Sequence, residues 1–175
     1  LIEDILTLSH LESGDIGLDL REVDIHRLVE SVLDGLREMA DKKEVALKNS
    51  VPKDITLQAD SQRLFQAINN LVENGIKYGG ACVCVSASQA NDELDLCVED
   101  DGPGIPAEAC DRIFERFFRV DKARSRELGG TGLGLSIVKH VTQLHGGTAR
   151  VESALGQGTS FHLTFPIPSI RAEAT

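Results

Sequence analysis

The sequence predicts an α+β fold, a two-layer sandwich in which a mixed sheet is covered on one face by helices. Three observations support this prediction. Segments with the apolar spacing of helices alternate with segments whose apolar residues alternate as in half-buried strands. Two of the strand-like segments are joined by a short turn, which is typical of an antiparallel hairpin. The chain has 175 residues, 41% hydrophobic and 26% charged, which fits one compact domain.

The first residues carry an apolar helical stripe, formed by Leu1, Ile5, Leu8 and Leu11. A helix of this length is marginal on its own. It either docks on the domain or is the end of a longer helix, and the second interpretation is favoured because the sequence does not begin with Met. We therefore predict a helix remnant over residues 1–14, the main domain over 15–168 and a short tail over 169–175.

The next elements follow from the same periodicities. A strand is expected around residues 17–23, and Asp24 is a suitable N-cap for a helix that runs to Met39. Two short strands are then expected at 45–51 and 55–58.

Asp60 is the second predicted N-cap, and its helix is expected over residues 61–78 because apolar residues recur there at helical spacing. Strands near 81–88 and 93–99 should form a hairpin through a turn at 88–92. The last expected elements are a short helix after the glycines near residue 102, a mobile loop over 119–130, a helix over 131–144 and a hairpin of 147–153 with 158–165.

The net charge of −10 and the pI near 4.9 argue against a broad surface for nucleic acid or an anionic membrane. A phosphate site must then be a local group of cations and backbone N–H groups, and Lys122, Arg124 and Arg126 are candidates. No apolar run approaches the roughly eighteen residues of a membrane span, and the first residues lack the basic region of a signal peptide. A cytoplasmic protein is expected, with an inner-membrane anchor left open for the full-length protein.

Four cysteines occur at positions 82, 84, 97 and 110, without a CxxC pair or a nearby histidine cluster. Zinc ligands usually come in such pairs, so free thiols are the expected state. Cys82 and Cys84 should share one face of a strand, where a thiol packs as a small apolar group.

A polar strip is expected on the helix over 61–78. Asn70 and Asn74 stand four residues apart, and Lys77 extends the strip by three more. Asn is a poor residue for a helix interior unless its amide has a role. An amide oxygen can complete the shell of a magnesium ion that also holds water and phosphate oxygens, and a Lys ammonium can pair with phosphate. The alternative is a solvated polar face that binds nothing.

Asp100 ends the second hairpin strand, where its carboxylate can accept a hydrogen bond from an exocyclic amine. Gly102 and Gly104 keep the backbone clear of a flat base. Residues 102–107 also fit the GxGxx(G/A) pattern of dinucleotide-binding folds, but two prolines and two preceding acids would make a poor pyrophosphate site. A pocket for adenine is the favoured interpretation.

A second glycine-rich segment, residues 129–135, adjoins the last predicted helix. Backbone N–H groups at the start of a helix suit an anion because they lie at the positive end of the helix dipole. The segment is not a Walker loop, because no Lys follows Gly134. A turn with a positive φ explains one glycine, whereas four glycines in six residues indicate a phosphate-binding loop.

Together, these segments resemble the catalytic and ATP-binding domain of bacterial sensor histidine kinases, in the superfamily that also contains gyrase and mismatch-repair ATPases. The resemblance runs from residue 20 to residue 167 and implies the Bergerat-type ATP-binding fold. It rests on the asparagine box at 70–78, the first glycine box at 100–104, the phenylalanine box at 114–118, the second glycine box at 130–135 and the final turn at 156–159. Residues 117–126 are similar to the lid of phosphate-regulon-type sensor kinases.

The resemblance implies a site for ATP and Mg²⁺, in which Asn74 binds the metal, Lys77 is catalytic with it, and Asp100 binds adenine. The other residues implied to bind the nucleotide are Asn70, Tyr78, Gly102, Gly104, Ile105, Arg119, Arg124, Gly130, Thr131, Gly132, Leu133, Gly134, Leu135 and Thr159. Two positions depart from many relatives: Asp101 replaces an Asn and Gly75 an Ala. Gly75 should soften its helix by about 0.5–1 kcal/mol relative to Ala.

The resemblance also implies the reaction. The domain would transfer the γ-phosphoryl group of ATP to a histidine on a helical hairpin of the same or a sister chain, for relay to an aspartate of a response-regulator receiver domain. The full-length protein would be a homodimer, and this chain alone monomeric or weakly associating. His10 lies in the wrong helix to be that acceptor.

Relatives that hydrolyse ATP place a water-activating Glu where this chain has Asn70, and an amide cannot act as a general base. We therefore expect little hydrolysis. Glu73 is expected to be a structural or solvent-facing acid. The rival interpretation is a nucleotide-binding interaction module without transfer activity, but the presence of all the ligand-type residues argues against it.

Overall fold

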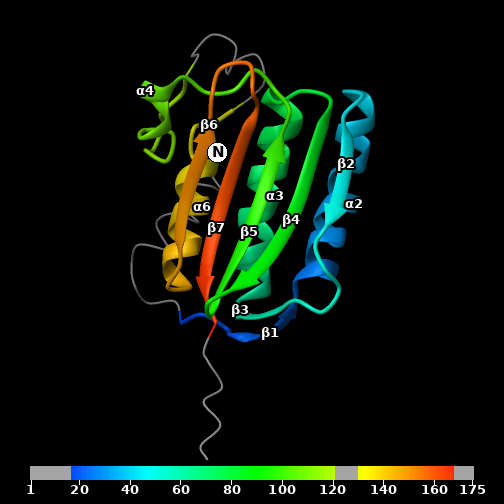
Figure 1. The fold of residues 1–175 in the computed structure, drawn as a ribbon, viewed down its shortest axis with the longest axis vertical. Helices are drawn as coiled ribbons and strands as arrows, with labels where there is room; N and C mark the ends of the chain where they lie inside the picture. The colour runs from blue at the N-terminus through cyan, green and yellow to red at the C-terminus, as the bar shows by residue number, and fades with distance from the viewer. Residues whose placement is uncertain (1–16, 121–129, 168–175) are drawn as a thin grey trace, which may run out of the picture.

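The computed structural model describes residues 17–120 and 130–167. The helix predicted over 1–14, the loop positions 121–129 with the cation candidates Lys122, Arg124 and Arg126, and the tail over 169–175 lie outside the described residues. The predicted fold class is confirmed. A mixed five-stranded sheet carries helices on one face, seen behind the sheet in Figure 1.

The sheet has the strand order β2-β4-β5-β7-β6, so its two edges come from distant parts of the chain. The strands are β2 (Ala46–Ser50), β4 (Cys82–Ala90), β5 (Glu93–Asp100), β6 (Thr148–Ser153) and β7 (Thr159–Pro166). Only β2 and β4 pair in parallel; the other neighbours are antiparallel. The β4–β5 turn is shorter than predicted, because Asn91 and Asp92, both at positive φ, reverse the chain in two residues.

Three helices form the second layer: α2 (Ile25–Lys42), α3 (Ser61–Tyr78) and α6 (Gly134–Leu144). Helix α3 contacts both α2 and α6 and also packs on β4 and β5 (Figure 1). The short antiparallel pair of β1 (Arg21–Asp24) and β3 (Thr56–Ala59) lies at the foot of the molecule in this view. Helix α3 is therefore the central element of the helical layer.

The remaining short element is α4 (Ala107–Cys110), which follows the first glycine box. Helix α6 begins three residues later than predicted. Gly132 has a φ of +75°, which is outside the helical region, so residues 130–133 form a loop that leads into the helix.

The core lies between the sheet and the helices and follows the predicted periodicities. On β5, for example, Leu94, Leu96 and Val98 are buried, whereas Asp95 and Cys97 point to the opposite face. Burial, with the nearby charges of Asp95 and Glu99, raises the pKa of the Cys97 thiol to about 11, so this thiol is neutral at physiological pH. All four cysteines are free.

Helix α3 starts and packs as its sequence dictates. The Asp60 carboxylate accepts hydrogen bonds from the backbone N–H groups of Gln62 and Arg63, and thus caps the helix as predicted. Gly75 is buried against β4, where an added Cβ would lie only 2.7 Å from Cγ2 of Val83. The glycine is explained by this close approach, beyond the softening of the helix that the sequence suggested.

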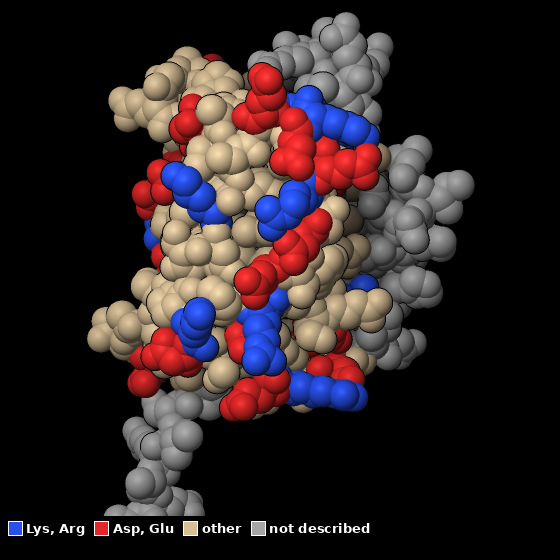
Figure 2. Space-filling model, turned by 90° about the vertical axis from the view of Figure 1, so that its right-hand side faces the viewer, with Lys and Arg blue, Asp and Glu red and all other residues tan. Residues whose placement is uncertain are grey.

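Charges of both signs are interleaved on the face that carries α2 and β2 (Figure 2). Along α2, Asp34 pairs with Arg37 and Glu38 with Lys42, each one helical turn apart and both exposed. This face therefore offers a polyanion no continuous basic surface. No helix in the described segments is both long enough and apolar enough to cross a membrane.

We expect Asp60→Ala to lower the free energy of unfolding by about 1–2 kcal/mol, because it removes the acceptor for two N–H groups at the start of α3. Asp60→Asn is the matched control, since its amide oxygen can still cap the helix. Urea unfolding of the two variants tests this expectation. Equal losses in both would show that the carboxylate charge, and not the cap, stabilises this end of α3.

Candidate functional site

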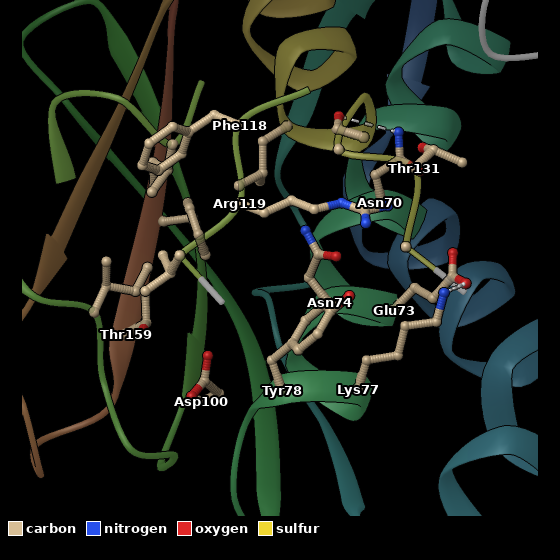
Figure 3. A pocket seen from close by; sticks show the side chains of 18 of the residues that line it. Asn70, Glu73, Asn74, Lys77, Tyr78, Asp100, Phe118, Arg119, Thr131 and Thr159 are labelled. Carbon is tan, nitrogen blue, oxygen red and sulfur yellow. Dashed lines mark hydrogen bonds and ion pairs between the residues drawn. The ribbon is translucent and has the colours of Figure 1, made fainter. Parts of the chain in front are cut away.

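The predicted motifs meet at one cavity of about 430 Å³, a size typical of small-molecule sites. Helix α3 forms one wall, the end of β5 with the turn after it forms the opposite wall, and the glycine-rich loop before α6 closes the site (Figure 3). Its lining residues are Asn70, Glu73, Asn74, Lys77, Tyr78, Asp100, Pro103, Gly104, Ile105, Ile113, Phe118, Arg119, Val120, Gly130, Thr131, Gly132, Gly134, Leu135, Thr159 and Phe161.

The α3 wall is polar because Asn70, Asn74 and Lys77 all face the cavity from one side of the helix. The Asn70 side chain donates a hydrogen bond to the carbonyl oxygen of Gly134, 3.4 Å away, which links α3 to the first residue of α6. No hydrogen bond from the described residues occupies the side-chain amide of Asn74. Its oxygen is thus available to a ligand.

Asp100 lies on the opposite wall, at the end of β5 (Figure 3). One carboxylate oxygen accepts a hydrogen bond from the backbone N–H of Gly102 at 2.9 Å. Burial raises the pKa of the Asp100 carboxyl group above its ordinary value; the Gly102 bond opposes this shift, and the nearby acids Asp101 and Glu99 add to it. The site therefore holds a partly desolvated acceptor that a hydrogen-bond donor on a ligand would satisfy.

A small hydroxyl network fixes the backbone beside Asp100. Thr159 on β7 is the strand partner of Asp100. The hydroxyl oxygens of Thr159 and Ser153 are 3.0 Å apart and share a hydrogen bond. The Ser153 hydroxyl also accepts from the backbone N–H of Ile105 and donates to the carbonyl of Gly158. Ser153 thereby ties the residue that follows the first glycine box to the turn between β6 and β7.

Apolar side chains complete this end of the cavity. Ile113 and Phe161 are buried, and the Phe114 ring packs edge-on against Phe161 with 6.2 Å between ring centroids. Phe118 also lines the cavity, and the Arg112 guanidinium lies 4.6 Å above its ring. An acceptor set among apolar and aromatic groups suits a flat heterocycle with an exocyclic amine.

The glycine-rich loop is joined to the phenylalanine box by a hydrogen bond from the N–H of Phe117 to the carbonyl oxygen of Gly132, at 2.8 Å. Thr131 lines the cavity, and its hydroxyl also accepts from the N–H of Leu133. Two segments far apart in the sequence are thus held together at the rim of the site.

Most of the residues predicted to bind the nucleotide line this cavity, and two of the described ones, Gly102 and Leu133, do not. The backbone of Gly102 packs against Gly79, and a Cβ added to Gly102 would lie only 2.5 Å from the Cα atom of Gly79. Gly102 therefore allows the turn after β5 to approach the end of α3 closely. The side chain of Leu133 is completely buried in the core. Arg124 lies outside the described residues.

Glu73 was expected to be a structural or solvent-facing acid, and its ion pair agrees with a structural role, but its place in the cavity lining was not predicted. Glu73 lines the cavity and forms an ion pair with Lys77, with 2.5 Å between Oε1 and Nζ. A signal for this was present, because Glu73 is three residues from Asn70 and four from Lys77, and such spacings share one helix face. Ser153, Ile113 and Phe161 were also missed, and their local sequences carry no signal of a site.

We expect Asp100→Asn to raise the free energy of unfolding at pH 7, because Asn keeps an acceptor for Gly102 but removes a poorly solvated charge. The pKa of Asp100 is raised in the folded state, so ionisation destabilises the fold above that pKa, and the penalty disappears below the unfolded-state value near 3.9.

The advantage of Asp100→Asn should therefore shrink as the pH falls from 7 toward 4. Urea unfolding at a series of pH values measures it. Glu22→Gln, at an exposed position on β1, controls for the loss of one negative charge. An advantage that stays constant with pH would contradict the electrostatic explanation.

Comparisons with known proteins agree with this geometry. Residues 59–169, more than half of the chain, match the family described as histidine kinase-, DNA gyrase B- and HSP90-like ATPase. The sensor-like histidine kinase SenX3 of Mycolicibacterium smegmatis is 39% identical over 168 residues, which cover 95% of this chain and 44% of SenX3. The chain thus spans less than half the length of this relative.

Two solved structures are similar in fold. Full-length ShkA in complex with AMPPNP superposes with a TM-score of 0.82 at 32% identity, covering 94% of this chain and 35% of ShkA. The mycobacterial sensor histidine kinase MprB gives a TM-score of 0.72 at 30% identity, covering 84% of this chain and 97% of that structure. With the converging motifs and the family match, these likenesses show that the chain belongs to the histidine kinase-, DNA gyrase B- and HSP90-like ATPase family, as an ATP-binding domain of the sensor histidine kinase type.

Proposed function

We propose that this chain binds ATP with Mg²⁺ and donates the γ-phosphoryl group to a histidine on a helical hairpin of the same or a sister chain. One observation carries the proposal: Asp100 lies at one end of a single cavity, and Asn74, Lys77 and Arg119 lie toward the other (Figure 3). This layout matches a molecule with an amine-bearing base at one end and phosphates at the other.

The residues present fit a magnesium ion. Mg²⁺ prefers oxygen ligands and keeps several waters and phosphate oxygens, so one protein oxygen suffices to place it. The amide oxygen of Asn74 is the candidate, since its side chain faces the cavity and forms no hydrogen bond with the described residues. The ion would neutralise phosphate charge, while Lys77 and Arg119 add cationic groups at the same end.

The site favours transfer to a positioned acceptor over hydrolysis. Asn70 occupies the position from which a carboxylate would activate water, and its amide is bonded to Gly134. The side chains supply orientation and charge neutralisation, which are the main contributions of protein groups to phosphoryl transfer. The histidine acceptor would complete the reaction.

The wider organisation is part of the same proposal. Residues 1–14 would be the end of a hairpin helix, 15–168 the kinase domain and 169–175 a tail. The phosphoryl group would pass to an aspartate of a response-regulator receiver domain. The full-length protein would be a homodimer that works in the cytoplasm, with or without an anchor in the inner membrane.

The direct test mixes the chain with an acceptor hairpin and γ-labelled ATP in the presence of Mg²⁺. Label that is stable to base and labile to acid on the hairpin histidine would support the proposal. Nucleotide binding without transfer to any hairpin tested would favour the rival function, an interaction module that only binds ATP.

We expect Asp100→Asn to weaken ATP binding by about 1–3 kcal/mol, because the new NH₂ group would face the amine of adenine and leave both donors unpaired. Calorimetry measures the change. Asp101→Asn is the control, since the Asp101 carboxylate accepts from the N–H of Cys82 and does not line the cavity. Unchanged affinity in Asp100→Asn would contradict the adenine assignment.

We expect Asn74→Ala to reduce phosphorylation of the hairpin at least tenfold, while the free energy of unfolding changes by only about 0.5 kcal/mol because the side chain is not part of the core. Labelled-ATP transfer and thermal unfolding are measured on the same preparation. Asn74→Asp keeps an oxygen ligand and should retain more activity than the alanine variant. A large loss of stability with transfer intact would reverse the assignment.

A further inference from the structure

The ion pair between Glu73 and Lys77 is placed where a nucleotide's phosphates would lie. Both residues line the cavity from α3, and their side chains are 28% and 21% exposed. In Figure 3 the two side chains meet on the wall away from Asp100, next to Asn74. The Lys77 ammonium is therefore already neutralised by an acid of the same helix.

We propose that Glu73 is the resting counter-ion of Lys77 and sets the affinity of the site for phosphate-bearing ligands. A bound polyphosphate has to compete with the Glu73 carboxylate for the Lys77 ammonium, and it is repelled by that carboxylate. Glu73 would thus keep nucleotide binding weaker and release faster than the cations alone would allow. This inference rests on the proposed function, because it takes Lys77 to face the phosphates.

The charges around the cavity support this competition. Its charged lining residues within the described chain are Glu73, Lys77, Asp100 and Arg119. Asp100 lies at the opposite end, so Glu73 is the acid that offsets the two cations at the phosphate end. A Glu four residues before a Lys is the favoured orientation for a helical pair, and partial burial reduces screening by salt. The competitor is therefore both well placed and effective.

Two other roles for Glu73 predict the opposite result. As a neighbour of Asn74, its carboxylate could be a second oxygen ligand for Mg²⁺. Alternatively, the ion pair could hold Lys77 in the rotamer that phosphate requires, which would aid binding by preorganisation. In both cases removal of the charge would weaken binding of ATP, whereas competition predicts that it strengthens binding.

The experiment compares the wild type with Glu73→Gln by calorimetry, using ATP and adenosine, each with Mg²⁺ and with EDTA. We expect the Kd for ATP to fall about three- to tenfold in the variant, a change of up to 1.4 kcal/mol. The Kd for adenosine should not change, because adenosine carries no phosphate. The KM for ATP in hairpin phosphorylation should fall with the Kd.

Glu38→Gln is the matched control. Glu38 pairs with Lys42 at the same spacing on α2, but both side chains are exposed, at 84% and 73%, and neither lines the cavity. The control changes the net charge of the protein by the same amount, so an equal gain in ATP affinity would overturn the inference in favour of a general charge effect.

The remaining outcomes separate this inference from the proposed function. If Glu73→Gln binds ATP more weakly in Mg²⁺ but not in EDTA, Glu73 is a metal ligand. If it binds ATP more weakly in both, the ion pair preorganises Lys77. Either result overturns the inference. A gain for adenosine as large as for ATP would also overturn it, since the effect would not involve phosphate. Failure of the wild type to bind ATP would instead refute the proposed function.

Discussion

Burial of one face of α3 is the constraint on which the site depends. The apolar stripe of this helix fills the space between α2, α6 and the sheet, and is formed by Leu64, Ala67, Ile68, Leu71, Val72 and Ile76. Because a helix is rigid, burial of this stripe directs the other face, with Asn70, Asn74 and Lys77, into the cavity. These three side chains need no loop to position them, so their geometry depends on the packing of the core.

The opposite wall shows a different balance between stability and function. Asp100 is held by Gly102 and the strand pairing with Thr159, but burial raises its pKa and makes its charge unfavourable. A carboxylate kept partly desolvated binds a donor more strongly than one that water already satisfies. Under the proposed function, this energetic cost in the free domain would make the position selective for a ligand amine.

Local rules were enough to predict much of this structure. The bounds of α3 and the caps at Asp24 and Asp60 were found from periodicity and capping alone. Periodicity identifies which side of an element is apolar but not its neighbours, so the role of Ser153, which joins two distant turns, could not be predicted. The spacing of Glu73 from Asn70 and Lys77 places it on their side of the helix, but only tertiary packing shows that this side borders a cavity.

The net charge of −10 would oppose binding of a polyanion if charge acted over the whole protein. It does not, because exposed charges are largely screened beyond a Debye length of about 8 Å at physiological ionic strength. Two acids of α2, Asp34 and Glu38, are paired with cations of the same helix, and Asp95 lies on the face of β5 opposite the core, whereas Lys77 and Arg119 border the cavity. The electrostatic potential in the cavity is therefore set by the few charged side chains that lie within one Debye length of it. In this group Glu73 is the acid that most reduces the attraction for phosphate, although the protein as a whole carries many more.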